Sequence, residues 1–322
     1  MNRMLLKKSL LEGRALLLAC MAALFVVGWT RVWLVSQFEM SRFQAILEQL
    51  REYQRFIPVP LEQLFTYAGR IALTFDEPVV VVCMCLWAIA RGSDCVSGEL
   101  GRGTMEMLLA QPVSRRQVFW SQASVTIGGV ALVALAVWLG IYTGILTTAV
   151  REPAPTPTWS VPLFGFQIPN PLAEKKFQWV PLSEVVDPQV FASAVFNLFS
   201  LGIFLAGFSS LFSSWDRYRW RTIGWVAGLT IFQMLVKLFS LASERFAWLA
   251  KCTFFTAYEP EAFVSVALNS PQEAWSLMRH PTGSESLILG PLGYDLILIG
   301  LGLLAYLVAT VVFQRRDLPA PL

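Results

Sequence analysis

The sequence predicts an all-α polytopic membrane protein with six transmembrane helices, organised as a single transmembrane domain over residues 1–322. Hydrophobic residues make up 55% of the chain and charged residues only 15%, whereas about a quarter of the residues in soluble domains are charged. Six apolar runs approach or exceed the roughly 20 residues that a membrane-crossing helix needs. Basic residues also gather on one side of these runs, as they do in loops retained in the cytoplasm.

The six predicted spans are residues 15–35, 71–90, 118–148, 190–212, 223–241 and 292–313. No convincing cleavage site follows the first run, so we interpret it as a retained helix and not as a signal peptide. Asp76 and Glu77 interrupt the second run, and its buried part could begin only at Pro78, a residue suited to the first turn of a helix. The third run is longer than one crossing requires, but no turn signal divides it.

Three longer segments are predicted on the opposite side of the membrane from the termini: about 36–70, 149–189 and 242–291. The first contains an amphipathic helix pattern over residues 38–56. The second is rich in proline, which favours extended structure over helix. We expect neither an internal repeat nor a separate soluble domain.

The distribution of charge predicts that both termini are cytoplasmic. The segments on the side of the termini carry 13 basic and 6 acidic residues, and those on the opposite side carry 11 and 15. Tryptophans agree with this orientation, because amphipathic rings prefer the headgroup level and five of them cluster at the proposed inner boundary: Trp87, Trp120, Trp215, Trp220 and Trp225.

Several functions are excluded by missing residues. The formal charge of +3 and the lack of a basic run with interleaved aromatics argue against nucleic acid as a partner. His280 is the only histidine, and no hydrolase or protease motif occurs, so we do not expect an enzyme. No G-x-x-x-x-G-K-[ST] sequence is present, so the chain lacks a phosphate-binding loop for ATP and needs no cofactor of its own.

Three groups of residues resemble functional sites, but the sequence around them favours a structural role. The five cysteines are an odd number in mostly apolar surroundings and imply no disulfide framework. Cys83 and Cys85 resemble a soft-metal ligand pair, yet residues two apart on a helix point in different directions, so we expect core packing. Lys237 and Asp295 lie in or beside spans, where snorkelling or a mutual ion pair costs less than a proton relay at the membrane centre.

The connection between the second and third spans, residues 97–117, carries the strongest functional signal. Thr104 is predicted to cap a short helix whose apolar residues Met105, Leu108 and Leu109 share one face, and Pro112 discourages its continuation. Ser114 and Gln117 form a capping box for the next helix. The product is a short surface helix suited to docking a partner, or an ordinary interfacial loop that only stabilises the helix hairpin.

This stretch resembles the glutamate, Gly-Thr, Leu-Leu, Pro-Val-Ser-Arg pattern of membrane subunits of type-two ABC exporters, the permease family that includes copper-enzyme maturation permeases. The basic segment from Leu5 to Arg14 is similar to the interfacial elbow helix of that family. The resemblance implies that the 97–117 segment is a cytoplasmic coupling helix that receives force from an ATPase. The residues to which we assign coupling are Glu99, Gly103, Thr104, Glu106, Leu108, Leu109, Pro112, Ser114, Arg115 and Arg116.

The resemblance further implies a permease subunit of an ATP-driven exporter in the bacterial cytoplasmic (inner) membrane. Its partners would be a separate ABC ATPase that binds ATP and Mg, a second membrane subunit in a homo- or heterodimer, and membrane lipids. The alternatives are an ion-coupled secondary transporter and a non-transporting scaffold for an assembly machine. No motif identifies the cargo.

Overall fold

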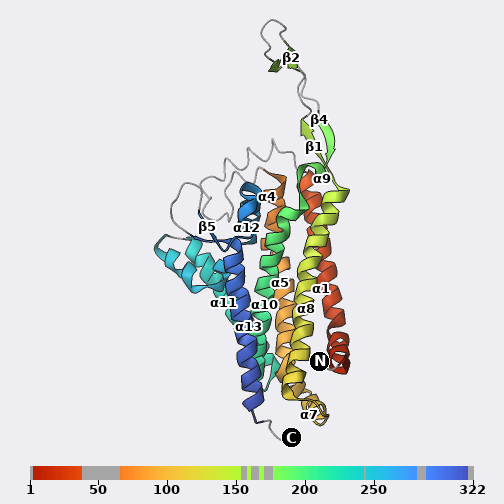
Figure 1. Ribbon diagram of the computed structural model, residues 1–322, viewed down its shortest axis with the longest axis vertical. Helices are drawn as coiled ribbons and strands as arrows, with labels where there is room; N and C mark the ends of the chain where they lie inside the picture. Colours follow the sequence, from red (N-terminus) through yellow and green to blue (C-terminus); the bar gives the residue numbers. More distant parts are fainter. Residues whose placement is uncertain are drawn as a thin grey trace.

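A computed structural model describes residues 3–37, 66–153, 158–160, 167–169, 177–242, 244–280 and 288–317. Within these ranges six helices are long and apolar enough to cross a membrane, in agreement with the predicted fold class. The long helices lie side by side along the long axis of the molecule (Figure 1). The amphipathic helix predicted over residues 38–56 lies outside the described ranges.

The long helices are α1 (Arg3–Gln37), α5 (Pro78–Ser93), α8 (Arg115–Thr147), α10 (Ala192–Trp215), α11 (Arg219–Ala242) and α13 (Pro291–Arg315). The second run begins at Pro78, which occupies the first turn of α5, and the third run forms one unbroken helix. The segment from Leu5 to Arg14 is continuous with α1. Its placement as an elbow along the membrane surface therefore stays a prediction.

Shorter elements connect the long helices. The α-helices among them are α4 (Tyr67–Ala72), α6 (Glu99–Gly101), α7 (Thr104–Leu109), α9 (Leu182–Val185) and α12 (Pro260–Asn269). The 3-10 turns are η2 (Leu73–Asp76), η4 (Pro188–Phe191), η5 (Glu244–Cys252), η6 (Phe254–Ala257) and η7 (Pro271–Glu273). The strands are β1 (Ala149–Pro153), β2 (Thr158–Ser160), β3 (Gln167–Pro169), β4 (Phe177–Pro181), β5 (Met278–Arg279) and β6 (Ile288–Leu289).

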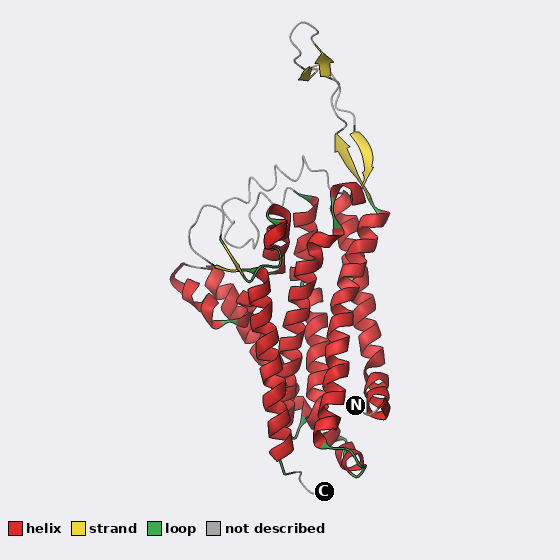
Figure 2. Cartoon of the chain, in the orientation of Figure 1, coloured by secondary structure: helices red, strands yellow, loops and turns green. Residues whose placement is uncertain are grey.

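The two ends of the helical bundle differ. The first residue of α1, the last residue of α13 and the short helix α7 lie at one end, here called the terminal end (Figure 1). Strands β1 and β4 project from the opposite end, here called the hairpin end, as an antiparallel pair running from Ala149 opposite Pro181 to Pro153 opposite Phe177 (Figure 2). The proline-rich 149–189 segment is thus extended in its described strands, as the sequence predicts.

Helices α1 and α8 pack through small residues. The buried residues of α1 recur every three or four positions from Leu5 to Val35, so a single stripe faces the rest of the chain. At Gly140 of α8 an added Cβ atom would come within 2.3 Å of the Phe25 carbonyl oxygen. Only glycine allows so close an approach, which is how membrane helices gain van der Waals contact where lipid removes the hydrophobic drive between them.

The centre of the bundle holds large aromatic side chains from several helices. Trp87 of α5 is 1% exposed, and its indole N–H donates to the Thr126 carbonyl oxygen of α8 at 3.0 Å. Its ring fills the space opposite Gly129, so Trp87 packs inside the chain, and its depth at the inner headgroup level stays a prediction. Trp215, Trp220 and Trp225 are exposed, as an interfacial position requires.

Candidate functional site

The connection between α5 and α8, at the terminal end, together with Arg115 and Arg116 in the first turn of α8, contains the residues to which the sequence assigns coupling. Helix α5 passes into a π-helical turn, η3 (Asp94–Gly98), and then into α6. Gly103 follows with a φ of 70°, a left-handed conformation that favours glycine, and reverses the chain into α7. Ser114 and Gln117 then make the predicted capping box at the start of α8.

Ser213 of α10 holds the π-helical turn together. The backbone N–H groups of Val96 and Ser97 donate to its Oγ atom at 3.1 and 2.9 Å. The Ser213 hydroxyl in turn donates to the Ser93 carbonyl oxygen at 2.9 Å. One buried hydroxyl thus satisfies the backbone donors that the wider turn displaces, at a kind of bulge that is frequent at functional sites.

Glu99 is fully buried and joins three helices. Lys8 of α1 donates to its two carboxylate oxygens at 2.8 and 3.1 Å, and Gln122 of α8 donates to Oε1 at 3.2 Å. Thr104 of α7 also donates its hydroxyl to the carboxylate. The sequence predicts Glu99 as a coupling residue, and the structure places it inside the chain, where it contacts helices and not solvent.

Asp94 forms a second buried ionic centre one turn earlier. Arg102 binds it at 2.7 Å, Arg219 of α11 at 3.3 Å and Arg91 at 3.4 Å. Arg91 also donates to Ser9 of α1 at 2.6 Å. The hydrogen bond with Asp94 raises the pKa of Arg102, so its guanidinium is held more firmly in the charged state.

The apolar face of α7 turns toward the chain. Met105 is 1% exposed and Leu108 8% exposed, and Leu108 packs with Leu5 of α1 and Val118 of α8. The expectation that Met105, Leu108 and Leu109 present an apolar docking surface is therefore wrong for the first two. Leu109 is half-buried, since its neighbours on α1 and α8 cover part of it.

The outward surface of the connection consists of other residues, here called the tip: Arg102, Gly103, Glu106, Met107, Ala110, Gln111, Pro112 and Arg116. Met107 is the most exposed large apolar side chain among them, at 72%. Thr104 does not cap α7, because Gly103 occupies the N-cap position and the Thr104 hydroxyl points to Glu99.

Arg115 fastens the start of α8 to the end of α13. Its Nη1 atom donates to the carbonyl oxygens of Phe313 and Arg316 at 3.2 and 2.5 Å. A cation at a helix C-terminus satisfies free carbonyl groups and the negative end of the helix dipole. Arg115 therefore acts within the chain, whereas Arg116 is exposed.

Sequence reasoning missed the partners of this site. Lys8, Arg91, Asp94, Gln122, Ser213 and Arg219 received no coupling role, although they surround the predicted segment. Two signals were available: the Arg91 and Asp94 pair at the end of an apolar run, and the four serines near the end of α10. Neither indicates which distant helix supplies the contact.

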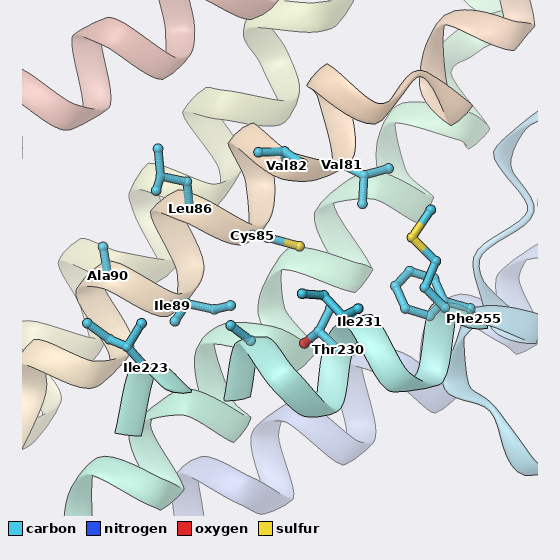
Figure 3. A pocket seen from close by; sticks show the side chains of 12 residues that line it. Val81, Val82, Cys85, Leu86, Ile89, Ala90, Ile223, Thr230, Ile231 and Phe255 are labelled. Carbon is cyan, nitrogen blue, oxygen red and sulfur yellow. The ribbon is translucent and has the colours of Figure 1, made fainter. Parts of the chain in front are cut away.

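An apolar groove separates α5 from α11 (Figure 3). Its cavity volume is about 350 Å³, and its lining includes Cys85 and Ile89 of α5 and Ile223, Thr230 and Ile231 of α11. The Thr230 hydroxyl in its wall donates its proton to the Val226 carbonyl oxygen, so it has no proton left to donate to a guest. The groove suits an apolar molecule, an acyl chain or an apolar helix.

The remaining predicted constellations show no catalytic arrangement. Lys237 donates to the carbonyl oxygens of Phe255 and Tyr258, while Asp295 accepts from Asn197 at 2.7 Å, so the two do not form the mutual ion pair considered from sequence. Met84 is buried between Cys83 and Cys85. Among the described residues no group of three His, Cys, Asp or Glu side chains is placed to hold a metal.

The two ionic centres make a mechanical connection between the tip and the bundle. A displacement of α6 and α7 would pull directly on α1 and α8 through Glu99, and on α5 and α11 through Asp94. The Glu99 and Asp94 carboxylates are buried, and they resist separation from their basic partners because a charge left alone in a low dielectric is costly.

Comparison with known proteins gives one finding on the family. A family model described as "ABC-2 family transporter protein" matches residues 14–318, nearly the whole chain. No curated protein is significantly similar in sequence.

Proposed function

The chain belongs to the ABC-2 family of transporter proteins, and from this premise we propose that it is the subunit through which a separate ATPase drives export across the membrane. It is a multi-pass membrane permease subunit of an ABC transporter, and its family implies association with an ABC ATPase subunit. We further propose that the 97–117 segment couples the chain to ATP hydrolysis and that transport is outward. The closer likeness to copper-enzyme maturation permeases is also part of this proposal.

The observation that carries the proposal is the exposed tip on a buried ionic support. Met107, Glu106 and Gln111 face away from the chain, while Glu99 and Asp94 behind them bind four long helices and the bridging Arg102. A partner that moves the tip would therefore move the bundle. The ATP and Mg would be bound by that partner, since this chain has no phosphate-binding loop.

In the proposed arrangement the terminal end faces the cytoplasm of a bacterial inner membrane, and a second membrane subunit faces the groove between α5 and α11. One chain leaves this groove open on one side, and a second copy or a related subunit would enclose it as a path for the cargo. The chemical identity of the cargo is left open. The mass of the purified complex, measured by light scattering, tests whether a second membrane subunit is present.

The proposal is tested by replacing Met107 with aspartate. A charge at this exposed position leaves the core intact and should abolish docking, because an apolar contact would have to bury a carboxylate. We expect at least a tenfold loss of the ATPase activity that co-purifies with the tagged chain from membranes, a cost of about 1.4 kcal/mol in binding.

The matched control is Met278→Asp, a change at a 57% exposed methionine in β5 at the hairpin end. It should leave co-purified ATPase activity unchanged. Equal ATPase recovery with Met107→Asp and wild-type protein, at equal levels in the membrane, would show that the tip is not the docking surface.

A further inference from the structure

Two acidic side chains meet near the hairpin end, at the opposite end of the bundle from the tip. Asp76 is the last residue of η2, just before α5, and Glu261 is the second residue of α12. Elements η2 and α12 pack against each other, and the two carboxyl groups lie close enough for each to shift the pKa of the other. Glu261 is 2% exposed, and no N–H or O–H group in the described part of the chain donates to the buried atoms Asp76 Oδ2 and Glu261 Oε2.

One cation acts on both carboxyl groups, and it is already engaged. Lys237 of α11 donates to the carbonyl oxygens of Phe255 and Tyr258 at 3.0 Å each, and its Nζ atom lies 3.8 Å from Glu259. An ammonium group shared in this way cannot neutralise two further carboxylates. The pair therefore keeps an excess of negative charge unless it takes up a proton.

The other ionisable groups on the packed elements have their own partners. The Tyr258 hydroxyl donates to the Phe75 carbonyl oxygen at 2.7 Å, and Cys85 of α5 lies near that ring. Glu77 pairs with Arg31 of α1 at 3.0 Å, and Asp295 of α13 accepts from Asn197 of α10.

Arg70 of α4 lies over the Tyr67 ring. Arg31 of α1 and Arg70 of α4 thus make other contacts, and neither donates to the buried Asp76 Oδ2 or Glu261 Oε2 atoms.

Two carboxylates in contact inside a protein cannot both ionise, because their repulsion is poorly screened there. A single proton converts one of them into an O–H donor and gives the contact a strong hydrogen bond. Burial, the hydrogen bond and the charge of Asp76 raise the pKa of Glu261 to about 10, and burial also raises the pKa of Asp76.

We propose that Asp76 and Glu261 form a proton-binding site that holds one shared proton at neutral pH and fastens α12 to the start of α5. The second observation that supports it, beside the contact itself, is the buried Oε2 atom of Glu261, to which no group in the described part of the chain donates and which a proton on the pair would satisfy. A metal ion is a poor alternative occupant, because the described residues offer no group of three suitable ligands. Loss of the proton would set two negative charges against each other and separate the two segments.

The proposal predicts that stability falls with rising pH. A carboxyl whose pKa is higher in the folded than in the unfolded chain contributes stability that is complete below the unfolded value and is lost as pH rises toward the folded value. For Glu261 this window runs from 4.5 to about 10. The melting temperature of the purified chain should fall by roughly 3 °C or more between about pH 5 and pH 9.

Infrared difference spectroscopy on the purified full chain tests the proton directly. Wild-type protein at neutral pH should show the carbonyl stretch of a protonated carboxyl group, and the double replacement of Asp76→Asn together with Glu261→Gln should remove it. Both replacements are isosteric with the protonated acid and should also flatten the pH dependence of melting. Asp295→Asn and Glu273→Gln, which alter carboxyl groups outside the pair, should retain the signal.

The result that would overturn the site is a signal that survives the double replacement, or its absence from wild-type protein at neutral pH. If the double variant fails to fold, the wild-type chain still decides the question. Its melting temperature should fall from about pH 5 upward, its carboxyl signal should disappear only at the alkaline end of that window, and a signal lost already below neutral pH would contradict the proposal.

Discussion

At the scale of single residues, Glu99 is a buried and hydrogen-bonded carboxylate although it lies in a surface connection. Its carboxylate accepts from Lys8, Gln122 and Thr104 without contact with solvent. Carboxylates on the same short segment differ sharply in environment, because Glu106 is exposed seven residues later. The two acids that the sequence groups together as coupling residues therefore have separate tasks: Glu99 supports the tip and Glu106 belongs to its surface.

The first residue-scale prediction concerns the charge on Glu99. Glu99→Gln keeps the shape and some hydrogen bonds but removes the buried negative charge opposite the Lys8 ammonium, which then keeps only its longer contact with Glu12, so we expect the free energy of unfolding to fall by about 1–3 kcal/mol. Thermal unfolding in detergent measures the change. Glu106→Gln is the matched control and should change stability little, and an equal effect of the two variants would contradict the assigned role of Glu99.

The hydroxyl of Ser213 supports a second prediction. Ser213→Ala leaves the N–H groups of Val96 and Ser97 without their acceptor, and each buried unsatisfied donor costs about 1–3 kcal/mol. Ser214→Ala is the control, since that buried hydroxyl donates only within α10, to Ser210. Hydrogen exchange at the π-helical turn should accelerate in Ser213→Ala and not in Ser214→Ala. Unchanged exchange in both variants would mean that Ser213 does not hold the turn.

At the scale of helices, the contact between α1 and α8 depends on glycine at one position and not at another. Gly140→Ala would bring a methyl group against the Phe25 backbone, and overpacking of this kind costs about 1–3 kcal/mol. Gly128→Ala on the same helix meets nothing within 4 Å and should be neutral or stabilise the helix by up to about 1 kcal/mol. The melting temperature should therefore fall in Gly140→Ala and stay the same or rise in Gly128→Ala. A change in the same direction in both variants would contradict the close contact between α1 and α8.

The sequence predicts helices well and their mutual contacts poorly. The six spans follow from the length of apolar runs, and the Ser114 capping box follows from residues three positions apart. The apolar face of α7 was recognised, but the pattern does not say whether a partner or the chain itself covers that face. Lys8 and Glu99 are 91 positions apart, and a single sequence contains no information on which turns of two distant helices meet.

At the scale of the whole molecule, the position of both chain ends supports a topology prediction. The terminal end carries the basic segments, and we expect it to be cytoplasmic. In a chain whose native cysteines are replaced by alanine, a membrane-impermeant thiol reagent should label Gln178→Cys and Glu273→Cys in intact cells. Gln111→Cys should react only after the membrane is opened. Labelling of Gln111→Cys from outside would reverse the orientation.

The six long helices differ in how much of their surface is buried inside the chain, and therefore in how many contacts a movement of each would break. In the most apolar window of each helix, 72% of the α10 stretch is buried inside the chain but only 11% of α11. Tilting α11 breaks few protein contacts, whereas shifting α10 disturbs α5, α8 and α13 together. The two helices meet at the short turn between Trp215 and Arg219, and Arg219 connects α11 to Asp94. Within one chain, a force applied at Arg219 should therefore tilt α11 about this turn more easily than it shifts α10, and the contacts of Lys237 with the Phe255 and Tyr258 carbonyl oxygens set how far the other end can follow.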